Sequence, residues 1–349
     1  MKQSSKSKSS DAAALVLVAV DVAAASLVVA SKAEGKAEAV ASYANTPAGH
    51  RGLIKHITAG GARARVILEA TGVYSLGLAL ALHGAERVEV MVINPRTSKD
   101  YQRACGTRAK TDRVDALGLL DYLERMPFVA WTAPPARVLT LQQLTRRIFQ
   151  LKAEVVREQA RLHAVRFTPD EDHLIKHDLE LNLAHLRRRI VSLQTAAARL
   201  VAEDNTLQAL VARVTTAPGV ARLSAHRLLA ELLVLPADLK APQWTAHAGL
   251  DPRPVESGSS VHKPRRITKT GNRYLRTALF MPTLVAIQRC PQVRAYYEAL
   301  VARGKKRKQA VIAVMRKMLH AIWGMLRHET NFNAELFYTS NPRNTETNA

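Results

Sequence analysis

Residues 15–30 read LVLVAVDVAAASLVVA, and this stretch decides the fold of the first part of the chain. Residues 15–20 are apolar and rich in valine, so they predict a buried strand that ends at Asp21. Residues 26–30 predict a second strand that pairs with the first. The basic start at residues 1–10 also resembles a secretion signal or a membrane anchor. Asp21 disfavours both, because a central Asp costs about 2.5–3.5 kcal/mol on membrane insertion.

Further strands alternate with helices after this pair. RARVILE (63–69) predicts a buried strand that ends at Glu69, SLGLALALHGA (75–85) predicts a helix, and VEVMVINP (88–95) predicts a strand that stops at Asn94-Pro95. KTDRVDALGLLDYL (110–123) has apolar residues at helical spacing, with Thr111 as the predicted N-cap. This alternation is typical of an α/β domain.

Breaks in composition divide the rest of the chain. WTAPPA (131–136) interrupts regular structure, and residues 137–204 predict two long helices separated by a polar break at 168–170. Such a helical hairpin or coiled-coil arm needs a partner to bury its apolar stripe, which indicates oligomerisation. We therefore predict a disordered tail (1–12), an α/β domain (13–135), a helical arm (136–204), a mainly helical domain (205–330) and a disordered tail (331–349).

The charge of the chain indicates a polyanionic partner. The 349 residues include 51 Lys and Arg against 29 Asp and Glu, a net charge of +22. Residues 1–130 carry only +5 of this excess and residues 131–349 carry +17. A nucleic acid fits this charge better than a small neutral substrate does. Cys105 and Cys290 form neither a disulfide framework nor a zinc site, which is typical of a reducing cytoplasm.

Four carboxylates form the first candidate site. Asp21 and Glu69 end two predicted strands, and Asp112 and Asp115 are three residues apart on one predicted helix. Strand ends meet at one edge of an α/β sheet, so we expect the four to converge. Clustered carboxylates are suited to Mg²⁺, and two such ions assist phosphoryl transfer. Each acid taken alone is better explained as an ordinary surface residue or a helix cap, and only the four together favour a metal site.

A serine-rich turn in a basic region forms the second candidate site. Ser257, Gly258, Ser259 and Ser260 lie within residues 253–276, which carry seven Lys or Arg and one acid. A serine hydroxyl among cations is suited to attack phosphorus, although a solvated loop that only grips phosphates is the plainer interpretation. His262 is interpreted as a phosphate contact or a bystander rather than as a general base. The predicted nucleic-acid-binding residues here are Arg253, Lys263, Arg265, Arg266, Lys269, Arg273 and Arg276.

Two more segments favour phosphate binding. RGKKRKQAVIAVMRK (303–317) has seven basic residues and no acid, and Lys305, Lys306, Arg307 and Lys308 are predicted to contact phosphates. APGVARLSAHRLLAEL (217–232) resembles a helix-hairpin-helix, whose turn offers backbone N–H groups to a phosphate. A turn that only packs against the domain is the alternative, because Ala221 replaces the usual second glycine.

The motifs also resemble a known family by their order. LEATGVY (68–74), KTDRVDA (110–116) and ESGSS (256–260) lie between VAVDV near the start and KTGNRYLRTALFMP (269–282) and KRKQAVIAVMRKML (306–319) near the end. In this order, over about residues 15–327, the chain resembles the IS110 transposases, the DEDD serine recombinases of bacterial insertion sequences. The resemblance implies a RuvC-type, RNase-H-like domain, a coiled-coil arm and a separate transposase domain.

The resemblance also implies a mechanism. It places Mg²⁺ on Asp21, Glu69, Asp112 and Asp115, and the nucleophile on Ser257, with Ser259 or Ser260 as alternatives. It implies single-strand cuts through a covalent phosphoserine, strand exchange through a Holliday junction, and a structured noncoding guide (bridge) RNA that selects donor and target DNA. It further implies a tetramer acting in the bacterial cytoplasm at the nucleoid.

One departure from the family pattern concerns the residues after Asp21. The family usually has a small residue and then Lys, whereas this chain reads Val22-Ala23-Ala24. That Lys is expected to position a phosphate or support the turn. Two other classes of function stay open: a metal-dependent junction nuclease without serine chemistry, and a nucleic-acid-binding protein without catalysis.

Overall fold

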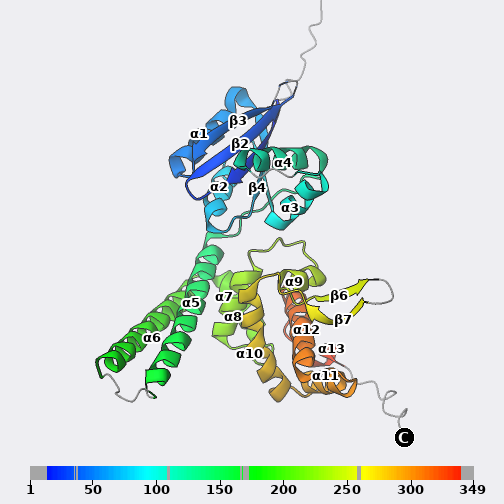
Figure 1. The fold of residues 1–349 in the computed structure, drawn as a ribbon. Helices are drawn as coiled ribbons and strands as arrows, with labels where there is room; N and C mark the ends of the chain where they lie inside the picture. Colours follow the sequence, from blue (N-terminus) through cyan, green and yellow to red (C-terminus); the bar gives the residue numbers. More distant parts are fainter. Residues whose placement is uncertain are drawn as a thin grey trace, which may run out of the picture. The chain divides into compact units, whose positions relative to one another are not determined.

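The computed structural model describes residues 14–34, 36, 38–107, 111–165, 167, 173–257 and 261–338, with the backbone alone for 253–257 and 261–266. The chain divides into two compact units, Met1–Ala133 and Pro134–Ala349. Helices dominate, and the first unit contains a mixed five-stranded sheet (Figure 1). Within the described ranges, no helix is both long enough and apolar enough to cross a membrane.

The sheet of the first unit has the order β3-β2-β1-β4-β5. β1 pairs antiparallel with β2, which pairs antiparallel with β3, and β1 and β5 each pair parallel with β4. This mixed sheet is consistent with an RNase-H-like domain. The strands are β1 (Leu15–Val22), β2 (Ser26–Ala33), β3 (Ala39–Ala44), β4 (Arg63–Glu69) and β5 (Val88–Ile93).

Helices cover both faces of this sheet, because its strands are apolar on both sides. Val18 and Val20 pack in one core with helices α1 (Pro47–Ile57) and α2 (Val73–His83). Ala19, between them, faces a second core with α4 (Asp112–Arg125). Successive side chains of a strand point to opposite faces, so β1 serves both cores.

The sequence analysis missed three elements of the first unit. β3 and α1 lie in residues 39–57, where alanine, glycine and small polar residues leave only a weak periodic signal. The third, α3 (Pro95–Ala104), begins where we predicted only the end of a strand. Asn94 is its N-cap and accepts a hydrogen bond from the N–H of Arg96 at 2.9 Å, while Pro95 occupies the first turn.

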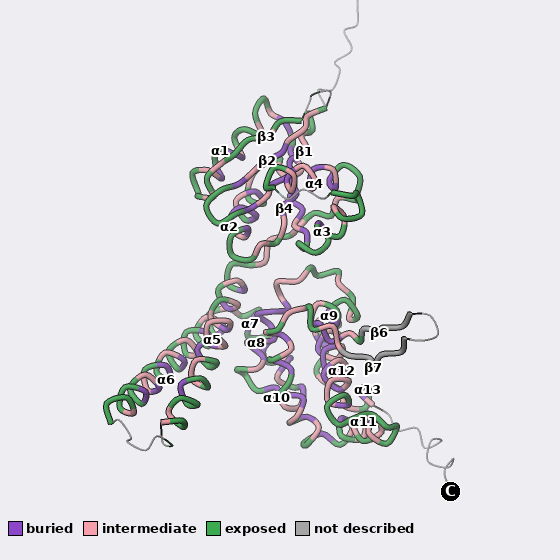
Figure 2. Tube along the Cα trace, viewed as in Figure 1, coloured by how far each residue is buried: buried purple, intermediate pink, exposed green. Residues whose placement is uncertain are grey.

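The second unit begins with the two long helices of the arm, α5 (Ala136–Val165) and α6 (His173–Ala202). They pack against each other through Ile148 and Leu151 of α5 and Leu186 and Ile190 of α6. Buried positions recur between exposed ones along both helices (Figure 2). Coiled-coil pairing of this arm with another copy stays a prediction.

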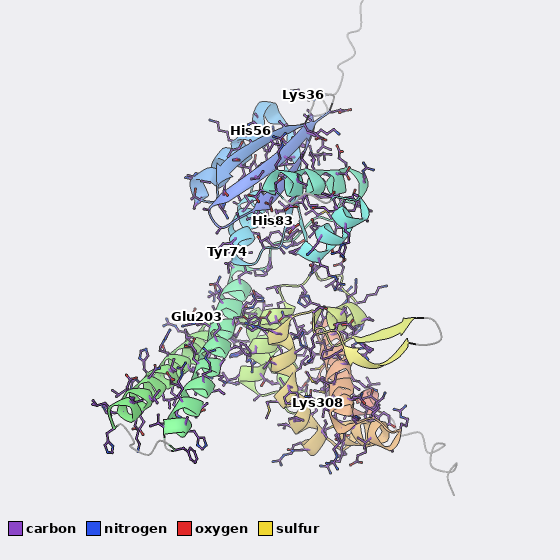
Figure 3. The ribbon with its side chains drawn as sticks, viewed as in Figure 1. Lys36, His56, Tyr74, His83, Glu203 and Lys308 are labelled. Atoms are coloured by element: carbon purple, nitrogen blue, oxygen red, sulfur yellow. The ribbon has the colours of Figure 1, made fainter. Side chains whose placement is uncertain are left out.

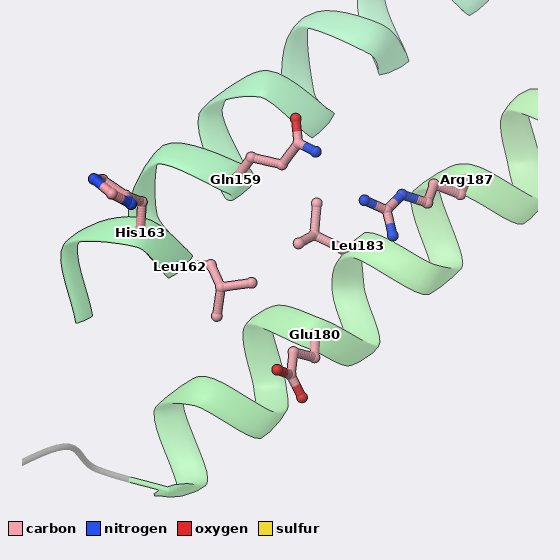
Figure 4. Close-up of a pocket in the computed structure, with 6 residues that line it drawn as sticks. All are labelled: Gln159, Leu162, His163, Glu180, Leu183 and Arg187. Atoms are coloured by element: carbon pink, nitrogen blue, oxygen red, sulfur yellow. The ribbon is translucent and has the colours of Figure 1, made fainter. Parts of the chain in front are cut away.

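A cavity of about 460 Å³ lies between the helices of the arm. Figure 4 shows its six lining residues, which come from both helices: Gln159, Leu162, His163, Glu180, Leu183 and Arg187. None of the predicted site residues lies in this cavity.

The rest of the second unit is a helical core with one β-hairpin. The root of the arm joins this core through Val138 and Leu141 of α5 and Ala197 and Val201 of α6. Its elements are α7 (Asn205–Thr215), α8 (Arg222–Leu232), α9 (Ala241–His247), β6 (Pro252–Ser257), β7 (Val261–Ile267), α10 (Arg273–Arg289), α11 (Pro291–Ala302), α12 (Arg307–Arg327) and α13 (Ala334–Phe337).

The structure corrects one predicted tail and bears on one alternative. Residues 331–338 belong to the fold, because Phe337 of α13 is 3% exposed and packs in the core. The predicted disordered tail therefore begins too early at residue 331. Gly219 has a φ of +80°, and a Cβ there would lie 2.2 Å from the carbonyl oxygen of Pro282. The turn of 217–221 therefore packs against α10, which fits the packing interpretation of this segment, and phosphate binding by the turn stays a prediction.

Candidate active site

Two of the four predicted acids lie side by side at one edge of the sheet. Val20 of β1 pairs with Leu68 of β4 in the parallel register, and Asp21 and Glu69 each follow by one residue. The direction of parallel strands therefore brings both carboxylates to the same end of the sheet.

Asp112 and Asp115 occupy the first turn of α4, which packs against β1, β2 and β4. Thr111 is the N-cap, and its hydroxyl accepts a hydrogen bond from the N–H of Val114 at 3.2 Å. This cap fixes where the helix begins and so which residues stand in the first turn. Residues three apart share one helix face, so the two carboxylates project together.

The pKa of Asp21 indicates that the other three acids lie near it. Its pKa is raised to about 6, first by burial and then by the negative charges of Asp112, Asp115 and Glu69. The N–H of Val22 donates a hydrogen bond that acts in the opposite direction. Three acids from two other elements therefore lie within electrostatic range of Asp21, as the sequence analysis expected of a converging cluster.

The chemistry of this cluster fits a hard cation. Four carboxylates supply the oxygen ligands that Mg²⁺ prefers, and a cation relieves the repulsion that raises the pKa of Asp21. Across the part of the chain that the structure describes, however, no three His, Cys, Asp or Glu side chains form a ready metal-binding group. The four acids are close enough to interact electrostatically, but in the described structure they are not arranged as ligands of a single ion.

A polar network that the sequence analysis missed ties together the loops beside the acids. Asn45 donates its side-chain amide to the carbonyl oxygens of Ala23, at 2.8 Å, and Tyr74, at 3.1 Å. The Nε2 atom of His50 lies 2.8 Å from the Asn45 Oδ1 atom, which only accepts, so His50 donates. His50 is 8% exposed, and burial lowers its pKa. No pattern marks Asn45, because its partners lie 22 and 29 residues away.

The start of α2, four residues after Glu69, carries two exposed side chains, Val73 and Tyr74. Gly72 has a φ of +71°, in the left-handed region that favours glycine, and α2 begins directly after it. Val73 is 82% exposed and Tyr74 is 52% exposed. Figure 3 shows Tyr74 at the start of this helix. The first turn of α2 therefore exposes a valine and a tyrosine a few residues from the acid that ends β4.

The predicted nucleophile ends a strand of the hairpin. Ser257 is the last residue of β6 and pairs with Val261 of β7, while Ser259 and Ser260 lie outside the described residues. The base of the hairpin is fixed, because the hydroxyl of Thr268 donates to the Oδ1 atom of Asp251 at 2.7 Å. The N–H of Thr268 also donates to the carbonyl of Asp251 at 3.1 Å. The backbone thus holds Ser257 at the far end of an anchored hairpin.

The predicted basic residues divide by environment. Lys305, Lys306, Arg307 and Lys308 are exposed around the start of α12, as Figure 3 shows for Lys308. Arg276 instead donates to the carbonyl oxygens of Ala248, at 2.8 Å, and Gly271, at 2.9 Å, so it braces the loop before α10. The side chains of Arg253, His262, Lys263, Arg265 and Arg266 lie outside the described residues. Lys269 and Arg273 are exposed.

Two family models match this chain, one in each unit. A transposase model for the DEDD proteins of the IS110 group matches residues 18–165, which include all four acids. A second, described as the transposase IS116/IS110/IS902 family, matches residues 211–298, which include Ser257. The chain belongs to the IS110 family of transposases. As an IS110-family protein it is an enzyme of DNA recombination, a transposase or recombinase.

Relatives of this IS110-family chain support the assignment. A pilin gene-inverting protein from Moraxella bovis is 28% identical over 274 residues, covering 78% of this chain and 82% of that protein. Its counterpart from Moraxella lacunata is 29% identical over 278 residues, with the same coverage. The insertion element IS110 43.6 kDa protein of Streptomyces coelicolor is 31% identical over 160 residues, covering 45% and 37%.

The departure from the IS110-family pattern falls on an exposed turn. Ala23, where the family has Lys, lies between β1 and β2 with its side chain in solvent. Its carbonyl accepts the amide of Asn45, so the turn is supported without a lysine.

Proposed function

We propose that this transposase cuts and exchanges DNA strands through a covalent bond to Ser257, with Mg²⁺ held by Asp21, Glu69, Asp112 and Asp115. The observation that carries the proposal is the convergence of the four acids: Asp21 and Glu69 lie at the same end of adjacent parallel strands, and Asp112 and Asp115 share the first turn of the helix that packs on these strands. Mg²⁺ bound there supplies charge neutralisation for the oxygens that attack and leave during phosphoryl transfer.

The atoms of the serine step balance between Ser257 and the DNA. The Ser257 oxygen forms a bond to phosphorus, and the bond from phosphorus to a deoxyribose oxygen breaks. The proton lost by the serine is balanced by the proton that the leaving hydroxyl gains. The reverse reaction with a different DNA hydroxyl rejoins the strand, so no external energy source is needed. The basic residues near the hairpin favour this step by stabilising charge on the phosphate.

Formation of a protein–DNA adduct tests the proposal. Wild-type protein incubated with donor and target DNA and guide RNA should form an adduct that survives denaturation, and Ser257→Ala should form none while binding RNA normally. Adducts that persist in Ser257→Ala would reject Ser257 as the nucleophile. Ser259→Ala and Ser260→Ala are the matched controls, since they change neighbouring hydroxyls in the same sequence motif.

A metal-dependent junction nuclease is the second candidate. It is favoured by the position of all four acids within one compact unit, since such an enzyme needs only these acids and water. It predicts that Ser257→Ala still cleaves DNA and that cleavage needs no RNA. A protein that binds nucleic acid without catalysis would instead keep every activity in Asp112→Ala and Asp115→Ala.

Guide RNA and self-association complete the proposal. The large positive charge of residues 131–349 suits a protein that holds DNA and a structured RNA together, and the long arm suits assembly into dimers or tetramers. A foldable noncoding segment that pairs with both DNA ends should flank the gene. Because the proposed substrate is chromosomal DNA, we expect the protein to act at the nucleoid in the cytoplasm.

A further inference from the structure

Cations from three helices gather at the root of the arm. Arg146 and Lys152 come from α5, Arg227 from α8 and Arg273 from α10. Helix α5 packs against α8, and α8 packs against α10. Three of the four, Arg146, Lys152 and Arg227, are absent from the predicted nucleic-acid-binding residues.

Two of these cations already have partners within the protein. Arg146 forms two hydrogen bonds with Glu231, each at 2.8 Å, and Glu231 is 1% exposed. The guanidinium groups of Arg146 and Arg273 also lie over the ring of Tyr274, at 4.8 and 5.0 Å from its centre. Because two guanidinium groups cover this ring, it is not free to stack on a base.

The other two cations have no acid beside them. Among the described residues, no carboxylate lies within 4.0 Å of the charged nitrogens of Lys152 or Arg227. Burial lowers the pKa of Arg227, which is half-buried. Partial burial of the Lys152 ammonium also lowers the pKa of Lys152, and the charge of Arg227 lowers it further. An unpaired, half-buried cation such as Arg227 is unfavourable unless an anion compensates for the lost water, and Lys152, which is exposed, is accessible to the same anion.

The cavity beside Arg227 limits what that anion is. It has a volume of about 10 Å³, which is the size of one water molecule. It is lined by Thr145, Arg146, Phe149, Arg227, Glu231 and Tyr274. A metabolite does not fit in this space. Lys152 does not line this space and the Glu231 carboxylate does, so an anion that contacts both Lys152 and Arg227 lies outside it, at the protein surface.

We propose that Lys152 and Arg227 bind one backbone phosphate of a nucleic acid strand that passes the root of the arm. A phosphodiester matches the site because it presents a small charged group on a chain that remains in solvent. The site lies apart from the four acids and from Ser257 in the sequence. This inference rests on the proposed function only in identifying the anion as a phosphate of a nucleic acid.

Salt-dependent binding tests this proposal. Fluorescence anisotropy in EDTA measures the affinity of full-length protein for a DNA duplex and for an RNA hairpin between 50 and about 200 mM salt. Arg227→Gln and Lys152→Gln should each weaken binding roughly tenfold, and the pair should reduce the salt slope by about 1. The nucleic acid that shows the change identifies whether DNA or RNA supplies the phosphate.

The controls separate a binding site from a structural cation. Arg199→Gln removes the same charge from an exposed residue of α6 that is paired with Glu203, and its slope should stay unchanged. Arg227→Gln should unfold at the same temperature as wild type or higher, because it removes an unpaired, partly buried charge. Lys152→Gln, at an exposed position, tests the site should Arg227→Gln fail to fold.

Three results would overturn the proposal: unchanged slopes with both nucleic acids, equal losses in Arg199→Gln, or a marked fall in the stability of Arg227→Gln. Ser257→Ala keeps this site and should bind like wild type. A failed adduct assay with normal salt slopes therefore counts against the proposed chemistry and not against this site.

Discussion

Glu231→Ala is expected to destabilise the second unit strongly. The Glu231 carboxylate is 1% exposed and joins the arm to two other helices of the core. It accepts two hydrogen bonds from Arg146, one from Asn272 at 2.7 Å and one from Gln142 at 3.3 Å. Alanine at this position leaves all of these donors without their acceptor.

The expected loss is about 3 kcal/mol. Removing one partner of a buried ion pair typically costs about 3–5 kcal/mol. The lower end of this range applies here because the Arg146 side chain is 38% exposed. Water can therefore replace part of the hydrogen bonding that Arg146 loses with Glu231. For a unit of this size, about 3 kcal/mol corresponds to a fall in Tm of roughly 6–12 °C. Glu231→Gln keeps one acceptor oxygen and should lose less.

Tryptophan fluorescence measures this change in the second unit alone. Trp131 belongs to the first unit, whereas Trp244 and Trp323 belong to the second. In a Trp131→Phe background, emission during urea unfolding of the full-length chain therefore reports only the second unit. The midpoint should shift to lower urea in Glu231→Ala without a change in slope.

Glu329→Ala is the matched control. Glu329 is 79% exposed and pairs with Arg213 at 3.3 Å, so its loss should cost less than about 1 kcal/mol. Equal effects of Glu231→Ala and Glu329→Ala would refute the reasoning, because burial and the number of donors would then not determine the cost.

Three further substitutions test local features, each by thermal unfolding followed by circular dichroism. Gly219→Ala should cost more than Gly304→Ala, since both have φ near +80° but only Gly219 has an atom, the carbonyl oxygen of Pro282, in the way of a Cβ; similar losses would reject the close contact. Thr111→Ala should cost about 1 kcal/mol by removing the cap of α4, and no loss would mean that this cap does not hold the first turn. Asn45→Ala should cost about 1–3 kcal/mol, because two carbonyl groups lose their donor; a loss no larger than that of an exposed substitution would reject its role as a bridge.

The strands that carry Asp21 and Glu69 were predictable because their signals are local, whereas β3 was not. The apolar runs around Val18 and Val66 predict buried strands. Because these strands are parallel, the acids at their ends, Asp21 and Glu69, lie at the same end of the sheet. Thr111 was identified as a cap from the sequence alone, and its hydroxyl does accept from Val114. Such features depend on residues within one turn or one strand.

The networks around Asn45 and Glu231 were not predictable, because their partners are distant in sequence. Arg146 and Glu231 are separated by 85 residues, and nothing in either helix marks them as a pair. Arg276 looked like a phosphate contact for the same reason: its charge is visible in the sequence, but the carbonyl groups that it braces are not. The Lys152 and Arg227 pair likewise appears only when two helices are brought together.

The division of the chain at Ala133 and Pro134 affects how safely this enzyme handles a chromosome. Each unit has its own core, so we expect a mutation that unfolds the second to leave the four acids close together in the first. Under the proposed chemistry, the serine bond keeps a broken strand attached to the protein until it is rejoined. A chain that lost only its second unit would retain the acids without that tether. Protection of the host genome from unrepaired breaks would then depend on the stability of the serine-bearing unit.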